Sequence, residues 1–154
     1  MIIEAAAWDD PDVQRLTTDQ QTEIRARYGG KDEPGRPPSA ADVSVVLVAR
    51  GDDGTALGCG ALRELGGGVA EVKRMYVAPV ARGRGVSRSV LAGLEAGARA
   101  RGWAVLRLET GPLQPEAVGL YTGAGYRAIG AFGSYAGDPD AAGSLFFEKV
   151  LDAG

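Results

Sequence analysis

The sequence predicts an α+β fold in which helices flank one mixed, mostly antiparallel sheet. Three observations support this prediction. Between residues 43 and 77, β-branched runs alternate with glycine-containing turns, which indicates consecutive hairpins. From residue 86 the apolar residues recur at helical spacing. Residues 103–109 then form an almost continuous apolar segment, which is typical of a central strand.

The N-terminal elements are a short strand and a helix. Residues 2–6 are apolar enough to form a strand, and Asp10 followed by Pro11 is a typical helix start. Apolar positions are sparse from there to Tyr28. We therefore expect either one helix or two short helices broken near Thr17.

Residues 29–42 separate this helix from the hairpins. The segment holds three prolines, three glycines and several charged residues. Such a composition buries too little apolar surface to order itself, so we expect a flexible surface loop. The 28 residues before it are too few to fold alone. The loop is therefore an insertion in a single domain that spans residues 1–154.

The hairpin region predicts three strands. They cover residues 43–50, 56–65 and 69–77, with turns at residues 52–54 and 66–68. Short turns between neighbouring strands make the three antiparallel to one another.

A helix is predicted to begin at Val86 and to end before Gly102, which suits the left-handed position after a helix. The apolar strand at residues 103–109 follows it. Its continuous apolar character indicates that both of its faces are covered.

The last third of the chain predicts one helix and two strands. The helix opens at Pro115 and is closed by Gly125, and the strands cover residues 126–129 and 144–151.

Two residue counts restrict the chemistry. The 154 residues include no histidine and one cysteine. These counts exclude Ser-His-Asp and Cys-His catalytic pairs, and they predict no metal site. General acid–base catalysis would therefore depend on carboxylates, tyrosines, lysines or water.

Charge and hydropathy restrict the location and the partners. A single cysteine suits a cytoplasmic protein, and no apolar run is long enough for a signal peptide or a membrane span. The net charge of −3 disfavours nucleic acid as a partner. A homodimer is compatible with the sequence, which does not fix the oligomeric state.

The segment with the clearest chemical signal lies between a predicted strand and a predicted helix. It reads Arg82-Gly83-Arg84-Gly85-Val86-Ser87-Arg88. The amide groups at a helix N-terminus attract phosphate, and glycines let the phosphate approach. A nucleotide-binding P-loop motif is absent. On spacing alone, a phosphate site and a solvated basic turn fit this segment equally well.

Two motifs together resemble the GNAT superfamily of N-acetyltransferases. The first runs from Val77 to Ser87, with Arg82, Gly85 and Ser87 at the positions that mark the family's acetyl-CoA-binding loop. Ser87 stands where the family has glycine or alanine. The second motif is Ala117-Val118-Gly119-Leu120-Tyr121-Thr122-Gly123-Ala124-Gly125-Tyr126. The first 42 residues carry no family motif.

The resemblance implies a GNAT-like acyl-CoA N-acyltransferase fold and a set of roles. The backbone of Met75, Tyr76 and Val77 would pair with the pantetheine arm of acetyl-CoA, in an open gap between their strand and residues 103–109. The pyrophosphate would bind the loop made of Arg82, Gly83, Arg84, Gly85, Val86, Ser87 and Arg88.

Tyr121 would lie near the sulfur of CoA and protonate the departing thiolate. The chemistry is reasonable, because a thiol of pKa about 8.5 leaves more easily beside a proton donor. Without the motif, packing on the sheet would be the better explanation of this aromatic side chain.

The attacking amine must lose a proton, and a carboxylate is the expected base. Glu71 lies six residues before Val77, the position of the base in histone-acetylating members of the superfamily. An even spacing along a strand also puts both residues on one sheet face. A surface Glu71 paired with Lys73 or Arg74 is almost as good an explanation. Glu109, at a strand end, is the second candidate, and water is the third.

Other residues could border the acceptor pocket or contribute a thiol. Tyr28, Tyr135 and Asp138 lie in loops near the expected pocket, although a plain surface position is the commoner outcome. Cys59, between two glycines in a strand, is expected to be a small core residue.

The sequence thus predicts a transferase that moves an acetyl group from acetyl-CoA to a primary amine of a small molecule or peptide, by direct attack in a ternary complex. A non-catalytic module that senses acyl-CoA is the alternative. A third hypothesis, nucleic-acid binding through the arginines near residues 82–101, is opposed by the net charge.

Overall fold

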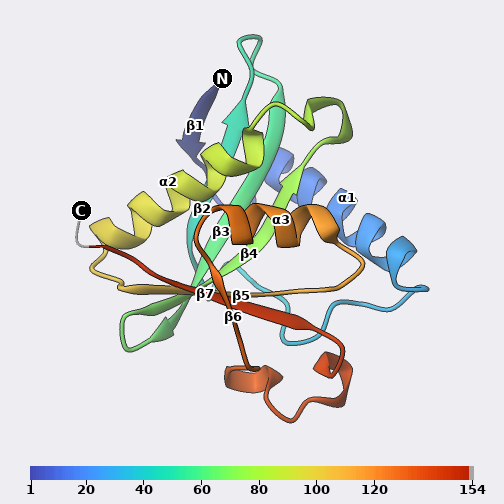
Figure 1. The fold of residues 1–154 in the computed structure, drawn as a ribbon. Helices are drawn as coiled ribbons and strands as arrows, with labels where there is room; N and C mark the ends of the chain where they lie inside the picture. Colours follow the sequence, from blue (N-terminus) through green and yellow to red (C-terminus); the bar gives the residue numbers. More distant parts are fainter. Residues whose placement is uncertain (153–154) are drawn as a thin grey trace.

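Seven strands form one sheet in the order β1-β2-β3-β4-β5-β7-β6, with three helices packed against it (Figure 1). The computed structural model describes residues 1–152. The elements are β1 (Ile2–Ala5), α1 (Pro11–Arg27), β2 (Val43–Arg50), β3 (Ala56–Gly66), β4 (Val69–Val77), α2 (Val86–Ala100), β5 (Val105–Thr110), α3 (Pro115–Gly123), β6 (Arg127–Ile129) and β7 (Leu145–Val150). The predicted mixed, mostly antiparallel α+β fold is confirmed: β4 and β5 are the only parallel neighbours among the described strands.

Helix α1 runs without a break from Pro11 to Arg27, so the alternative of two short helices is wrong. The Asp10 carboxylate caps it by accepting a hydrogen bond from the backbone N–H of Asp12 at 2.8 Å. The hydroxyl of Thr17 donates to the carbonyl of Gln14 inside the helix. This bond satisfies the threonine locally without interrupting the helix, and packing on the sheet overrides the weak helix propensity of the segment.

The two faces of the sheet carry different helices. On β2, Val48 packs in the cluster that includes Val13 and Leu16 of α1, whereas its neighbour Ala49 packs in the cluster that includes Leu94 of α2. Helix α3 joins the α2 side (Figure 1). Alternate residues of one strand therefore serve two separate cores.

Strands β4 and β5 separate soon after they meet. They pair only from Val69 to Glu71 on β4 and from Val105 to Arg107 on β5. Beyond these residues both strands continue without pairing to each other, up to Val77 and Thr110. The expected open gap between these two strands is thus confirmed, and it leaves backbone groups of β4 available to a ligand.

A bulge in β4 reverses one expectation. The register with β3 shifts by one residue between Cys59 and Ala61, and Arg74 has a φ of +58°. As a result Glu71 faces Arg63 on the α1 side, while Val77 packs on the α2 side. The expectation that Glu71 and Val77 share a face is therefore wrong, because the extra residue changes the parity of the strand.

Strand β5 is not covered equally on both faces, contrary to the expectation from its apolar sequence. Leu106 and Leu108 are fully buried, whereas Val105, Arg107 and Glu109 are only partly buried. The latter side chains face the other side of the sheet, where Arg107 lies over the Phe132 ring and bonds to Glu148 of β7. Within residues 1–152, no helix combines the length and the apolar character needed to cross a membrane.

Candidate active site

A cavity of about 1440 Å³ lies where β4 and β5 separate. It is lined by the second half of β4, the end of β5, one side of α1, the residues before α2, and α3. Most residues singled out by the sequence meet there: Tyr28, Met75, Tyr76, Val77, Arg82, Gly83, Gly85, Val86, Ser87, Glu109, Tyr121 and Asp138. Arg84, Arg88, Glu71 and Tyr135 are not among the lining residues.

The loop before α2 has the backbone geometry of an anion site. Gly83 and Gly85 have φ angles of +78° and +77°, which side-chain-bearing residues rarely adopt. No side chain caps α2, and its first intrahelical bond is donated by the N–H of Ser89 to Gly85 at 3.1 Å. The amides of Val86 and Ser87 precede that bond and therefore have no partner inside the helix. They lie at the cavity wall, ready to donate to a phosphate.

The three arginines of this loop differ in position. Arg84 and Arg88 are exposed, and only Arg82 lines the cavity. The guanidinium of Arg82 donates to Glu23 of α1 at 2.7 Å and to the carbonyl of Val77 at 3.0 Å, and it lies over the Tyr76 ring. Arg82 therefore ties α1 to the end of β4.

The backbone of β4 at the gap is partly occupied. The side-chain amide of Gln20, on α1, donates to the carbonyl of Met75 at 2.8 Å. Gln20 was missed by the sequence analysis. The available signal was a polar residue at helical spacing from Val13 and Leu16, on the buried face of the helix.

Tyr121 is buried and lines the cavity from α3. Its ring meets the edge of Tyr126 with 5.6 Å between centroids. Among the described residues its hydroxyl has no hydrogen-bond partner. Burial first, and the charge of Glu109 second, raise the pKa of Tyr121 above its usual range, so the phenol keeps its proton at neutral pH.

Glu109 lines the same cavity from the end of β5. Burial raises the pKa of its carboxyl to about 7, with a hydrogen bond from Ser144 acting in the opposite direction. The carboxylates of Glu33 and Glu71 raise this pKa further, and the ammonium of Lys73 lowers it. A carboxyl that titrates near neutrality can take up a proton and release it again in each turnover.

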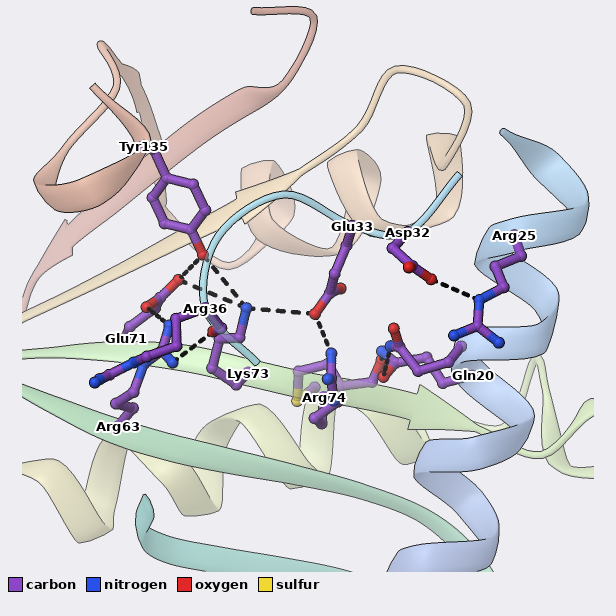
Figure 2. A network of polar contacts seen from close by, with 12 residues as sticks. Gln20, Arg25, Asp32, Glu33, Arg36, Arg63, Glu71, Lys73, Arg74 and Tyr135 are labelled. Atoms are coloured by element: carbon purple, nitrogen blue, oxygen red, sulfur yellow. Dashed lines mark hydrogen bonds and ion pairs between the residues drawn. The ribbon is translucent and has the colours of Figure 1, made fainter. Parts of the chain in front are cut away.

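Glu71 is held away from the cavity by its own partners. Its side chain is 1% exposed. One oxygen accepts from Arg63 at 2.8 Å, the other from the Tyr135 hydroxyl at 2.5 Å, and the Lys73 ammonium lies 3.9 Å away (Figure 2). With both oxygens bonded, Glu71 is arranged to hold the surrounding groups in place.

The 29–42 loop passes over this network. Figure 2 shows it crossing above β4 with Glu33 directed down toward Lys73 and Arg74. The carbonyl of Arg36 accepts from Arg63 at 2.8 Å, and residues 30–36 line the cavity. The segment thus covers the site. The flexibility expected of it stays a prediction.

The three loop residues suggested for the acceptor pocket have different positions. Tyr28 and Asp138 line the cavity. The Tyr28 hydroxyl accepts from the N–H of Leu113 at 3.0 Å. Tyr135 is buried beneath the loop, where burial raises the pKa of its phenol.

Two further small side chains, those of Cys59 and Thr110, are buried in or near the site. Cys59 is 1% exposed, as expected for a core residue, and burial raises the pKa of its thiol to about 12, which makes it a poor nucleophile. Thr110 lines the cavity with a buried hydroxyl that has no partner among the described residues. A ligand in the gap could bond to that hydroxyl.

Comparisons with known proteins agree with this geometry. The model of the acetyltransferase (GNAT) family matches residues 7–126. An IAA acetyltransferase from Azospirillum brasilense is 47% identical over 106 residues, which cover 68% of this chain and 67% of that protein. A crystal structure described as an acyl-CoA N-acyltransferase from Klebsiella pneumoniae is 36% identical, with a TM-score of 0.83 over 98% of this chain and 97% of that one.

A third similarity concerns the fold alone. A GNAT family acetyltransferase from Elizabethkingia anophelis, solved with acetyl-CoA bound, has a TM-score of 0.70 at 16% identity, over 97% of each chain.

Proposed function

The chain belongs to the acetyltransferase (GNAT) family, and from this premise we propose that its cavity between β4 and β5 holds acetyl-CoA and an amine in one ternary complex. One observation carries the proposal. The same cavity joins an uncapped helix N-terminus at Gly85 to the buried Tyr121 and the partly buried Glu109. A phosphate-binding end and an acid–base end are what acetyl transfer from CoA to an amine requires.

The residues present fit acetyl-CoA. The amides of Val86 and Ser87 donate to the pyrophosphate, and Gly83 and Gly85 leave room for it, because a Cβ built at either glycine meets no atom within 4 Å. The end of β4, from Met75 to Val77, does not pair with β5, and its backbone groups on that side are offered to the pantetheine arm. Acetyl-CoA supplies the activated acetyl group, and the protein orients it.

Glu109 is the base in this proposal, in preference to Glu71. Glu109 lines the cavity and titrates near neutrality, whereas Glu71 is bonded to Arg63 and Tyr135 outside the cavity lining. Glu109, directly or through a water molecule, takes the proton of the amine. The neutral amine nitrogen then forms a bond to the acetyl carbon while the bond from that carbon to sulfur breaks, and the nitrogen releases its second proton to solvent as the amide forms.

Tyr121 assists the departure of the thiolate. Its pKa is raised, so the phenol is protonated and donates its proton to the sulfur as the carbon–sulfur bond breaks. The proton on Glu109 returns to solvent, and the tyrosine is reprotonated from water before the next turnover. The products are the N-acetylated amine and CoA.

The acceptor in this proposal is a small molecule. Two features support it: the relative named IAA acetyltransferase, and residues 30–36, which form part of the cavity wall.

Calorimetric titration with acetyl-CoA tests the proposal. Saturable binding with 1:1 stoichiometry is expected, and Gly85→Glu should abolish it by placing a negative, strained side chain at the phosphate loop. Gly67→Glu is the matched control, because Gly67 also has a positive φ and open space but lies in the turn between β3 and β4. A folded wild-type protein that does not bind acetyl-CoA would refute the proposal.

A further inference from the structure

Two buried cations in the cavity wall have no role in the mechanism above. The side chains of Lys73 and Arg74 are 5% and 9% exposed, and both residues line the cavity. Burying an ammonium or a guanidinium is costly unless a negative partner neutralises it. The negative group that neutralises these two cations therefore indicates which kind of ligand the cavity can bind.

Their shared partner is Glu33, which comes from the loop and not from the sheet. One oxygen of Glu33 bonds to Arg74 and lies 3.5 Å from the Lys73 ammonium (Figure 2). Among the described residues Arg74 has no other ion pair. The second carboxylate near Lys73, that of Glu71, is 3.9 Å away and is already bonded to Arg63.

The attachment of Glu33 differs from that of the cations. Lys73 and Arg74 are fixed by the paired and bulged backbone of β4. Glu33 lies in a segment without helix or strand, flanked by glycines at positive φ at residues 30 and 35. A ligand carboxylate in the place of Glu33 would find the same two donors already in position.

The charges favour an anion at this point over a second cation. The carboxylates of Glu33, Asp42 and Glu71 are ion-paired with four cations, which are Arg36, Arg63, Lys73 and Arg74. The network therefore carries one net positive charge, and it does not attract an ammonium.

Glu109 lines the same cavity as Glu33, Lys73 and Arg74. Two cations, Lys73 and Arg74, and a proton acceptor, Glu109, thus line one cavity. This arrangement suits a molecule that bears both a carboxylate and an amine.

We propose that Lys73 and Arg74 form a carboxylate subsite of the acceptor pocket, which Glu33 fills when no acceptor is bound. The acceptor class is then an amino acid or a close analogue, with its carboxylate on Lys73 and Arg74 and its amine at Glu109. The role of the subsite in catalysis rests on the proposed function, acetyl transfer to an amine. Binding of an amino acid to the subsite can be tested without that reaction.

The first experiment needs no variant. Acetylation is measured for the common amino acids, each against its decarboxylated amine, such as lysine against cadaverine and phenylalanine against phenethylamine. We expect at least one amino acid to have a kcat/KM at least tenfold above that of its amine partner. Equal or better turnover of the amines would overturn the proposal, as would no turnover of any amino acid by a protein that binds acetyl-CoA.

Variants then identify the subsite. Glu33→Gln removes the competing carboxylate and should lower KM for the preferred amino acid about threefold to tenfold, because more of the protein is ready to bind it. KM for the amine partner should change less than twofold. Lys73→Gln should raise KM for the amino acid at least tenfold and leave that of the amine within twofold. Glu64→Gln is the matched control, since Glu64 is an exposed glutamate of β3 outside the cavity lining.

Binding separates the two proposals. The preferred amino acid is titrated into the protein without acetyl-CoA, for the wild type and for Lys73→Gln. A Kd at least tenfold weaker in the variant supports the subsite even if acetyl-CoA fails to bind, which would refute only the proposed function. An equal Kd in both proteins, or a higher KM after Glu33→Gln, would overturn the subsite.

Discussion

Tyr121 and Glu109 show how burial assigns different duties to two acidic side chains in one cavity. Loss of solvent raises the pKa of both groups. A phenol whose pKa rises stays protonated throughout the neutral range, so it can only donate. A carboxyl whose pKa rises to about 7 exchanges its proton near neutrality. The division between donor and acceptor therefore follows from the environment, without any histidine.

Glu109→Gln should abolish most of the turnover and remove one limb of the pH profile. In the wild type, kcat/KM should rise as pH increases through about 7, because only the deprotonated carboxyl accepts a proton. The variant should lose roughly 10²-fold to 10⁴-fold in kcat, which is the usual contribution of a general base. Steady-state rates between pH 5 and 9 measure both effects. If kcat/KM of Glu109→Gln still rose with pH through about 7, Glu109 would not be the group whose titration causes that rise.

The same substitution should stabilise the protein at alkaline pH. The folded pKa of Glu109, about 7, lies above its ordinary value of 4.5, so the folded state holds a proton that the unfolded state has lost. Its contribution to stability therefore falls as pH rises from about 4.5 through 7. At pH 8, Glu109→Gln should gain on the order of 2 kcal/mol, allowing for partial exposure. Urea unfolding at pH 5 and pH 8 would show a much larger gain at pH 8 than at pH 5.

Tyr121→Phe isolates the role of the phenol. The variant keeps the ring and its edge contact with Tyr126, so folding and acetyl-CoA affinity should be unchanged. We expect kcat to fall roughly 10²-fold, because the thiolate leaves without its proton donor. Stopped-flow detection of free thiol and calorimetric affinity for acetyl-CoA measure the two quantities. An unchanged kcat would remove Tyr121 from the mechanism.

At the scale of elements, the bulge in β4 determines which side chains meet. The extra residue near Arg74 turns Lys73 and Glu71 toward the loop and Val77 toward α2. It follows shortly after Glu71, the last residue of β4 that pairs with β5, so this local irregularity determines which side chains lie beside the cavity.

Gly60, on β3, allows α2 to approach the sheet opposite the bulge. A Cβ at this position would lie 2.5 Å from Met75 Sδ, 2.9 Å from Val90 Cγ1 and 3.0 Å from Leu94 Cδ1. Gly60→Ala should therefore destabilise the protein by about 1–3 kcal/mol, the usual cost of overpacking. Chemical denaturation measures the change.

Gly119→Ala is the contrasting control for Gly60→Ala. Gly119 is exposed inside α3 and a Cβ there meets nothing within 4 Å. Alanine should raise the free energy of unfolding by about 0.5–1 kcal/mol through helix propensity. If the two substitutions changed the free energy of unfolding equally, the close approach of α2 at Gly60 would have no effect on stability.

At the scale of the whole molecule, the cavity is where separate parts of the chain meet. It is lined by α1, the 30–36 segment, the phosphate loop, α3 and the ends of two strands. Arg82 and Gln20 join α1 to β4, and Glu33 joins the loop to β4. A ligand in the gap would contact all of these parts at once.

Acetyl-CoA should therefore stabilise the entire fold. At a concentration of 100 times its Kd, ligand binding adds about 2.7 kcal/mol to the free energy of unfolding. For a chain of this size that corresponds to a rise in Tm of roughly 5–10 °C. Differential scanning fluorimetry with and without acetyl-CoA measures the shift. Gly85→Glu should show no shift, and a full shift in that variant would place the ligand elsewhere.

The sequence alone determined the local elements, including the glycine-containing loop that precedes α2. Strand β4 was predicted from Val69 to Val77 and is found there, because turn glycines and β-branched residues act over short distances. The sequence also predicted that a helix begins at Val86, directly after Gly83 and Gly85, and α2 begins there. Tyr121 was reached only through the motif that contains it, since an aromatic residue in a helix is otherwise a core residue.

Only the tertiary structure decided which carboxylate faces the cavity and what covers it. Counting along the strand put Glu71 on the same sheet face as Val77. One bulged residue between them places the two on opposite faces, and Glu71 lies in a bonded network with Arg63 and Tyr135. Composition marked residues 29–42 as a surface loop, yet Glu33 reaches two cations about 40 positions away in the chain. Strand parity and loop contacts depend on pairing between distant segments, and neither is encoded in local propensity.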